Sequence, residues 1–293
     1  MGSSAWAAVV INYEAGSLLV ECVRSVLADA SAGEVELVVV DNGSSDGSVA
    51  ALRDAYPDVH VVRSPGNVGY ARAANLGAAA TYAPVVAVLN ADLTIAPGAA
   101  AAMLHRLECE PELGAIGPRV RNTDGTDYPS ARRLPSIPIA IGHGVLGLWW
   151  PTNPFTARYR ALNADAGKPR DVDWLSGSAM WFRRAALDAV GGWDERYFMY
   201  MEDLDLCTRL RDAHWRVAYE PAGEVVHVGG ASTSRRPYRM IAEHHRSAWR
   251  FMRQRFHGAR AALLPLAAIY LGFRLVLALG THAARSVGAR RGG

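Results

Sequence analysis

Two aspartates directly follow short apolar runs, at the points where buried strands would end. Asp41 follows residues 35–40, and Asp92 closes the turn that follows the run at residues 85–90. Continuous apolar runs are typical of central strands in parallel sheets, whose faces are both covered. Ligands of such sheets bind beyond the carboxyl ends of the strands, so both carboxylates are predicted to face one crevice. There, one could accept the imide N–H of uracil or thymine, and the other could hold a divalent cation against a diphosphate.

Each aspartate also has a plain structural interpretation. Asp41 begins a stretch of turn-forming residues and could bond to the backbone near Gly43. Asp92 could cap the segment in which Pro97 and Gly98 open a helix. The local sequence does not choose between the structural and the functional interpretation of either residue.

Acidic and aromatic side chains crowd residues 191–205. Acids are favoured in a first helical turn, and Asp205 with Arg209 makes an ordinary i,i+4 pair, so part of this block needs no function. Asp203, with Glu202 beside it, is less well covered by that explanation. A carboxylate flanked by aromatic surface suits a general base for a sugar hydroxyl, because partial desolvation raises its pKa toward neutrality.

His227 ends another short apolar run. A lone histidine is usually an ordinary hydrogen-bonded side chain. However, a cation at the turn of residues 90–92 would find one carboxylate there and would need a further ligand, which a neutral imidazole can supply to Mn²⁺.

The elements that must position these residues alternate between strands and helices, which predicts a doubly wound parallel sheet. The predicted strands of the first part are residues 7–11, 35–40, 59–62 and 85–90, and its helices are residues 18–27, 48–55, 70–80 and 99–107. Residues 118–169 lack a clear period and are predicted to form loops around the crevice. The later predictions are strands at 174–182, 217–219 and 225–228, helices at 185–190 and 202–213, and helical structure throughout after Tyr238.

The composition excludes several classes of protein. The 293 residues are half hydrophobic, and Lys plus Arg exceed Asp plus Glu only by 31 to 28, which argues against a nucleic-acid binder. Three scattered cysteines support neither a disulfide framework nor a cysteine metal site, and they fit a reducing cytosolic setting.

Residues 261–280 are long and apolar enough to suggest a membrane span. Arg274 lies inside this run, where it would cost about 2.5–3.5 kcal/mol, and Pro265 weakens the first turn. Several arginines flank the run on both sides. These features favour a helix that lies on an anionic inner leaflet or packs on a partner subunit in a homo-oligomer, with a simple core helix as the alternative.

The blocks together resemble the inverting family 2 glycosyltransferases, which have the glycosyltransferase A fold, over residues 7–230. The nucleotide-binding motifs of that family correspond to Asn12, Tyr13, Glu14, Asp41, Asn42, Arg72 and Asn75. Asn90, Ala91 and Asp92 occupy the place of its Asp-x-Asp metal motif. Glu202 and Asp203 occupy the place of its catalytic acidic pair, and His227 matches a late histidine that completes the metal site in some relatives. Asn90 departs from the aspartate of many members, which puts the strength of metal binding in doubt.

The resemblance implies an α/β fold with a Rossmann-like, mostly parallel sheet flanked by helices, and a C-terminal helical segment for membrane proximity or oligomerisation. Residues 1–117 would form the nucleotide-sugar-binding half, residues 118–237 the acceptor-binding and catalytic half of the same domain, and residues 238–293 a basic, amphipathic helical segment.

Within the family the chain is most similar to bacterial rhamnosyltransferases. This implies a metal-dependent, inverting transfer of L-rhamnose from dTDP-L-rhamnose to a lipid-linked saccharide such as N-acetylglucosaminyl-diphospho-polyprenol. Mn²⁺ or Mg²⁺ would be held by Asp92 and His227, and Asp203 would be the base. The setting would be cell-wall polysaccharide (arabinogalactan) synthesis at the cytoplasmic face of the plasma membrane, with peripheral attachment.

Three alternatives remain open. A family member that uses a UDP-sugar would show the same residues, because uracil and thymine offer the same N–H. A sugar-nucleotide pyrophosphorylase would need a Gly-rich first loop with Arg and Lys, which residues 12–17 do not have. A non-catalytic sugar-nucleotide-binding scaffold would have no use for Glu202 and Asp203 beside Asp92.

Overall fold

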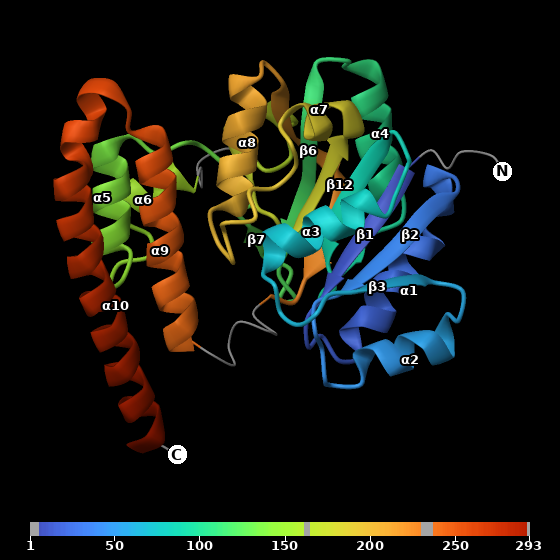
Figure 1. Cartoon of the computed structure of the whole chain (residues 1–293), viewed down its shortest axis with the longest axis horizontal. Helices are drawn as coiled ribbons and strands as arrows, with labels where there is room; N and C mark the ends of the chain where they lie inside the picture. The colour runs from blue at the N-terminus through green and yellow to red at the C-terminus, as the bar shows by residue number, and fades with distance from the viewer. Residues whose placement is uncertain (1–5, 161–164, 230–236, 292–293) are drawn as a thin grey trace.

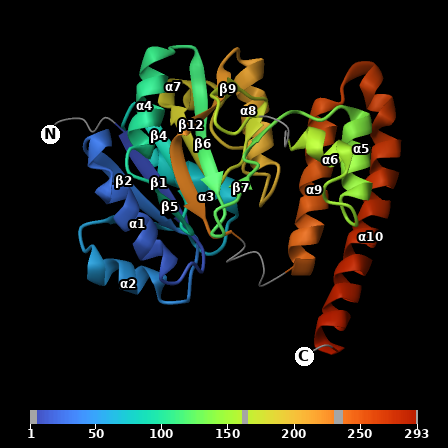
Figure 2. The same cartoon turned by 180° about the vertical axis from the view of Figure 1, so that it is seen from behind.

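The computed structural model describes residues 6–160, 165–229 and 237–291. Helices cover both faces of a twisted sheet, and a separate group formed by α5, α6, α9 and α10 stands beside it (Figure 1). The view from behind shows the same separation and places α10 on the outer side of that group (Figure 2).

Four parallel strands in the order β3-β2-β1-β4 form the first part of the sheet. They are β1 (Trp6–Asn12), β2 (Val35–Asp41), β3 (His60–Arg63) and β4 (Val85–Asn90), and the helices between them are α1 (Leu18–Ala28), α2 (Ser48–Ala55) and α3 (Tyr70–Ala79). In register, Asn12 lies opposite Asp41 and Ile11 opposite Asn90. The strand ends predicted to carry chemistry therefore meet at one edge.

The second part of the sheet is mixed and continues in the order β11-β6-β12-β5. Its strands are β5 (Leu93–Ile95), β6 (Leu113–Arg121), β11 (Ala179–Arg183) and β12 (Arg216–His227), with short β7 (Asp127–Tyr128) and β9 (Arg170–Asp171) alongside. β11 runs antiparallel to both β4 and β6, whereas β12 is parallel to β6. The predicted strands at 217–219 and 225–228 are one strand, β12, interrupted by a register shift between Glu220 and Glu224. The predicted strand at 174–182 is instead two strands, β10 (Trp174–Leu175) and β11.

Two apolar cores cover the faces of the sheet. One packs α1, α2 and α4 (Ala99–Cys109) against it and includes Trp6, Leu19 and Met103. The other packs α3, α7 (Arg184–Ala189) and α8 (Glu202–Asp212) and includes Phe182 and Leu206. β6 crosses the predicted boundary between the two halves at residue 117. In addition, β12 of the second half pairs with β5 of the first, so both halves share one sheet.

The prediction of loops for residues 118–169 is wrong in part. This stretch contains the end of β6, strand β8 (Ala131–Arg132), α5 (Ile137–Leu146) and α6 (Pro154–Tyr159). The sequence of α5 is apolar on nearly every side, so it lacks the alternation of polar and apolar residues by which a surface helix is found.

The last two long helices, α9 (Pro237–Arg255) and α10 (Leu264–Arg291), pack against each other. The Arg274 side chain of α10 turns inward, where Nε donates to the carbonyl of Gly144 at 2.9 Å and Nη1 lies 2.9 Å from Nε2 of His245. The opposite side of α10 exposes an apolar stripe that we call the α10 outer face. It consists of Ile269, Phe273 and Val276.

By length and composition alone, Gly258–Ala284 could cross a membrane, and only 11% of its most apolar window is buried. That exposure is inconsistent with a simple core helix. Arg274 argues less strongly against a span than the sequence indicated, because its charge is satisfied inside the helical group. The flanking Arg255 pairs with Asp212 and Arg250 lies over the ring of Tyr197, while the side chains of residues 285–291 lie outside those that the structure describes.

Candidate active site

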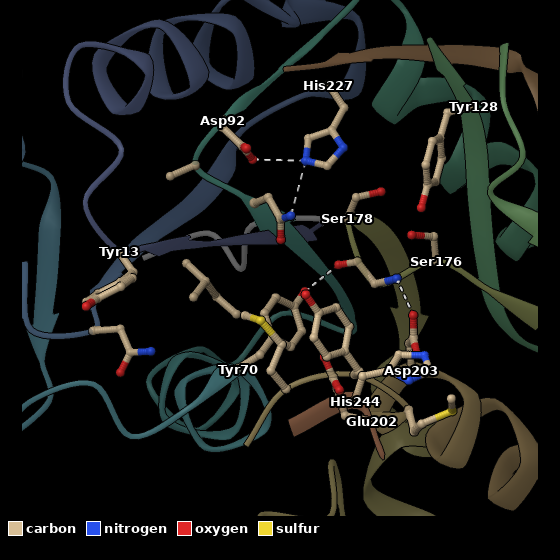
Figure 3. Close-up of a pocket in the computed structure, with 18 of the residues that line it drawn as sticks. Tyr13, Tyr70, Asp92, Tyr128, Ser176, Ser178, Glu202, Asp203, His227 and His244 are labelled. Atoms are coloured by element: carbon tan, nitrogen blue, oxygen red, sulfur yellow. Dashed lines mark hydrogen bonds and ion pairs between the residues drawn. The ribbon is translucent and has the colours of Figure 1, made fainter. Parts of the chain in front are cut away.

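A cavity of about 310 Å³ lies beyond the carboxyl ends of β1 and β4 (Figure 3). It brings together eight of the predicted site residues from distant parts of the chain. They are Tyr13, Asn42, Asn90, Ala91, Asp92, Glu202, Asp203 and His227. Asn12, Glu14, Asp41, Arg72 and Asn75 do not line it.

Asp92 and His227 form a contact at the edge of this cavity. Asp92 lies in the turn between β4 and β5, and His227 is the last residue of β12, which pairs antiparallel with β5 opposite Leu93. Oδ1 of Asp92 is 3.0 Å from Nε2 of His227, and the backbone N–H of Val228 donates to the Asp92 carbonyl at 2.9 Å. The strand pairing therefore fixes the distance between the two side chains.

The side-chain atoms at this contact suit a divalent cation that is also coordinated by oxygens of a bound substrate. Nδ2 of Asn90 also approaches Nε2 of His227, at 3.3 Å, and rotating this amide by half a turn would present an oxygen in its place. An imidazole nitrogen with carboxylate and amide oxygens suits Mn²⁺. Among the described residues, no three His, Cys, Asp or Glu side chains are grouped to hold a metal, so a cation here would need oxygens from a bound diphosphate.

The second acidic group sits at the start of α8. Tyr200 and Met201 precede it, both with φ of +67°, a left-handed conformation that costs energy in residues with a Cβ. This bend turns the backbone so that α8 begins inside the cavity. Oδ2 of Asp203 accepts the N–H of Gly177 at 3.0 Å and Oδ1 accepts the N–H of Leu204 at 2.8 Å, whereas Oε2 of Glu202 is buried without a partner among the described residues.

These surroundings separate the two carboxyl groups in acidity. Burial raises the pKa of Asp203. The hydrogen bonds from Gly177 and Leu204 act in the opposite direction, because they stabilise the anion. Burial and the nearby Asp203 charge raise the pKa of Glu202 well above its usual value. Both carboxyl groups therefore lose their protons less readily than exposed ones, and only Asp203 has hydrogen bonds that favour its anion.

The turn of Ser176, Gly177 and Ser178 connects the two acidic groups. The Gly177 amide donates to Asp203, the Gly177 carbonyl accepts the hydroxyl of Tyr70 at 2.5 Å, and the Ser178 carbonyl accepts the N–H of Asn90 at 2.9 Å. One short turn thus sets the spacing between the turn of Asp92 and the start of α8 (Figure 3).

The base-binding loop that the sequence predicts is folded around its own side chains. Nδ2 of Asn12 donates to the hydroxyls of Ser44 and Ser48, both at 3.0 Å. Oδ1 of Asp41 accepts the N–H of Ser44 at 3.0 Å. Asp41 thus forms the turn that the sequence suggested as an alternative to a binding role. Oε1 of Glu14 accepts the N–H of Ser45 at 2.8 Å. These bonds shape the loop beside Asn42 and Tyr13, which do line the cavity.

Arg72 and Asn75 lie on α3 and contact the segment that leads to α8. Nε of Arg72 is 3.7 Å from Glu195, and both side chains are at least half exposed. The Asn75 side chain bonds the backbone N–H and carbonyl of Trp193, each at 2.9 Å. The structure therefore supports a positioning role for these two residues, and direct contact with a nucleotide stays a prediction.

Sequence analysis missed an arginine enclosed by aromatic rings at the other wall of the cavity. The Arg132 guanidinium lies 4.7 Å from the ring centre of Trp174, 5.6 Å from that of Tyr128 and 5.9 Å from that of Tyr159. These residues come from three separate segments that share no sequence period. The only indication of this cluster in the sequence was the number of aromatic residues between positions 118 and 174. His244 of α9, which also reaches the cavity, had no such signal.

Comparison with known proteins agrees with this geometry. Residues 7–191 match the model of "Glycosyl transferase family 2". The chain belongs to this family. The glycosyltransferase is 41% identical over 261 residues to the N-acetylglucosaminyl-diphospho-decaprenol L-rhamnosyltransferase of Mycobacterium tuberculosis, with 85% of this chain and 84% of that one covered. It is also 30% identical over 207 residues to the pre-mycofactocin glycosyltransferase of that species, covering 66% of this chain and 37% of the relative.

Solved structures confirm the predicted glycosyltransferase A fold. GalNAc-T7 with UDP, GalNAc and Mn²⁺ superposes with a TM-score of 0.57 at 17% identity, covering 77% of this chain and 44% of that one. The mannosyltransferase PcManGT of Pyrobaculum calidifontis, in complex with GDP-Man and Mn²⁺, gives a TM-score of 0.56 at 19% identity, covering all of this chain and 77% of that one.

The acidic pair predicts a pH dependence of stability. A carboxyl group whose pKa is raised on folding binds more protons in the folded state, so its contribution falls as pH rises from the unfolded pKa toward the folded one. We expect the melting temperature to fall above about pH 5 as the pair ionises, and to fall less in Glu202→Gln. Thermal melts at several pH values test this, with Glu34→Gln, an exposed carboxylate, as control. Parallel pH curves for wild type and Glu202→Gln would contradict it.

Proposed function

We propose that this glycosyltransferase moves L-rhamnose, with inversion, from dTDP-L-rhamnose to a hydroxyl of N-acetylglucosaminyl-diphospho-polyprenol in cell-wall polysaccharide synthesis. The observation that carries the chemistry is one cavity with a partial cation site on one wall and a buried carboxylate, Asp203, on the other. The sugar and acceptor follow from the mycobacterial relative, which shares 41% of its residues over most of both chains.

The nucleotide would bind along the ends of β1 and β2, where Tyr13 and Asn42 line the cavity. Asn42 is held by its own bonds, since Oδ1 accepts the N–H of Val68 at 2.9 Å, so its position does not depend on the ligand. Asp41 would accept the N3–H of the base through whichever oxygen its turn leaves available.

The cation would be held by Asp92 and His227, with the Asn90 amide turned to offer its oxygen. A bound Mn²⁺ or Mg²⁺ would stabilise the negative charge that develops on the departing diphosphate. Asn90 replaces an anionic ligand by a neutral one, so the protein itself contributes little affinity without the donor diphosphate.

Asp203 would take the proton from the acceptor hydroxyl. The hydroxyl oxygen forms the new bond to the anomeric carbon as the bond to the diphosphate breaks, and that electron pair stays on the diphosphate oxygen. Attack from the opposite face inverts the configuration and needs no covalent intermediate. The hydrogen bonds from Gly177 and Leu204 hold both Asp203 oxygens in place, so the base is oriented before the acceptor arrives.

The α10 outer face would attach the enzyme to the cytoplasmic leaflet. Its three apolar side chains are 56–70% exposed, and Trp149 and Trp150, between α5 and α6, are 56% and 54% exposed. Exposed tryptophans and an exposed apolar stripe in one group of helices are typical of a protein that contacts the membrane interface. Such attachment would place the active site beside a lipid-linked acceptor.

Asp203→Asn is expected to lower kcat by about 100-fold or more, because a general base is removed. The Kd for dTDP, measured by calorimetry, should change little. Glu202→Gln is the matched control and should lower kcat less than Asp203→Asn, because no backbone amide of the described residues orients Oε2 of Glu202 as Gly177 and Leu204 orient Asp203. Turnover near the wild-type rate in Asp203→Asn would disprove the assignment. Thermal shifts with dTDP-L-rhamnose and a series of UDP-sugars distinguish thymine from uracil donors.

His227→Gln should weaken Mn²⁺ binding in the presence of dTDP by about tenfold or more, because one of the three proposed protein ligands is lost. Electron paramagnetic resonance of free Mn²⁺ measures this directly, and chelation should remove transferase activity from the wild type. His105→Gln, on an exposed part of α4, serves as the control. Equal Mn²⁺ affinity in His227→Gln and wild type would remove His227 from the site.

The double substitution of Ile269 and Phe273 by Ser should reduce binding to anionic phospholipid vesicles by about tenfold or more, because two exposed apolar side chains no longer enter the interface. Flotation measures the bound fraction, and Tyr82→Ser, at an 88% exposed position of the sheet domain, is the control. Unchanged flotation together with a lower mass in ultracentrifugation would instead identify this face as a subunit interface.

A further inference from the structure

A second cavity, of about 370 Å³, lies among the helices α5, α9 and α10. Both views of the fold place these helices together, away from the nucleotide-binding end of the sheet (Figures 1 and 2). We call it the helical cavity. Its wall is almost wholly apolar and includes Ile141 of α5, Phe251 and Met252 of α9, and Ala267 and Leu271 of α10. The volume is within the range of ligand pockets, about 300–1,000 Å³.

The helical cavity adjoins the catalytic cavity. Tyr159, Met201 and His244 line both of them. Met201 directly precedes Glu202 and Asp203, so the junction lies two residues from the proposed base. The two cavities therefore share part of their walls, and an apolar space lies next to the site of the reacting hydroxyl.

Arg132 stands on the catalytic side of this junction. Its Nε donates to the Pro129 carbonyl at 2.7 Å and its Nη2 to the Tyr128 hydroxyl at 2.9 Å. Its guanidinium is 5.9 Å from the ring centre of Tyr159, one of the junction residues. Among the described residues, no carboxylate lies within ion-pair distance of Arg132, and the Asp203 charge acts on it from within the same cavity. An anionic ligand in this cavity would therefore meet a guanidinium that forms no direct ion pair within the described part of the chain.

We propose that the helical cavity binds the first isoprenoid units of the polyprenyl diphosphate acceptor and that Arg132 receives the diphosphate. This rests on the proposed function. The acceptor carries a hydroxyl on a sugar, then a diphosphate, then a hydrocarbon chain. The protein presents a matching group for each part, with Asp203 and Arg132 in the catalytic cavity and an apolar cavity beside them.

The polar groups in the wall of the helical cavity do not oppose a hydrocarbon. Arg274 is bonded to Gly144 and His245, and Nδ1 of His143 lies 2.9 Å from the Thr156 hydroxyl. A chain in the cavity would leave these hydrogen bonds intact, so no buried polar group would lose a partner. The α10 outer face lies on the other side of the same helix, which places the cavity between the catalytic centre and the proposed membrane contact.

The test uses two acceptors with the same N-acetylglucosaminyl diphosphate head, one carrying a long isoprenyl chain and one an ethyl group, in the same detergent. Ala267→Trp projects a ring into the helical cavity, and Ile269→Trp on the α10 outer face is the matched control. We expect Ala267→Trp to raise KM for the isoprenyl acceptor by about tenfold or more, because its hydrocarbon chain would lose apolar contact area. The KM for the ethyl acceptor and the Kd for dTDP should not change. Met252→Trp, from α9, should do the same and replaces Ala267→Trp if that variant fails to fold.

Arg132→Gln should raise KM for both acceptors, since both carry the diphosphate. The inference is overturned if Ala267→Trp and Met252→Trp leave the isoprenyl acceptor unaffected, or if they raise both KM values equally. Wild-type protein that transfers rhamnose to neither acceptor would instead overturn the proposed function, whereas transfer to both with equal KM would overturn the cavity assignment alone.

Discussion

The hydrogen bond from the Gly177 amide to Asp203 is the interaction on which the arrangement of this site depends. It holds a buried carboxylate at the start of α8, and the same three-residue turn receives the Tyr70 hydroxyl and the Asn90 amide. Burial without such donors would favour a protonated and freely oriented acid. The left-handed bend at Tyr200 and Met201 brings α8 to that amide, and its cost is offset by packing around it.

Close backbone contact supports the bend from the other side. The N–H of Tyr70 donates to the Phe198 carbonyl at 2.8 Å, and Gly69, with φ of +90°, allows this approach because a Cβ there would lie 2.5 Å from that oxygen. Asn75 bonds the backbone of Trp193 one turn later. The motif around Gly69 thus shapes the catalytic loop, and the donor contact that the family resemblance implies for Arg72 and Asn75 stays a prediction.

Local sequence predicted the first part of the fold well because each element there carries its own signal. The runs before Asp41 and Asp92 are β-branched and apolar, and α2 was predicted with the bounds that it has. β6 was missed because Gly114, Gly117 and Pro118 interrupt its apolar run, and its identity as a strand depends on pairing with β11 and β12. α5 was missed because its apolar residues lie on all sides of the helix, so it has no amphipathic pattern. It packs against α10, where Gly144 lies next to Tyr270 and Arg274.

By itself, the sequence determined which residue types end which strands. That was sufficient for the family, the fold class and the carboxylates at residues 92, 202 and 203. The family resemblance already placed His227 with Asp92, and the tertiary structure gives their distance of 3.0 Å. The tertiary structure alone decided that Arg132 faces the same cavity and that Arg72 does not. The physical reason is that a strand end is a local property of the chain, whereas these contacts join residues more than a hundred positions apart, through strand pairing and helix packing that no local pattern records.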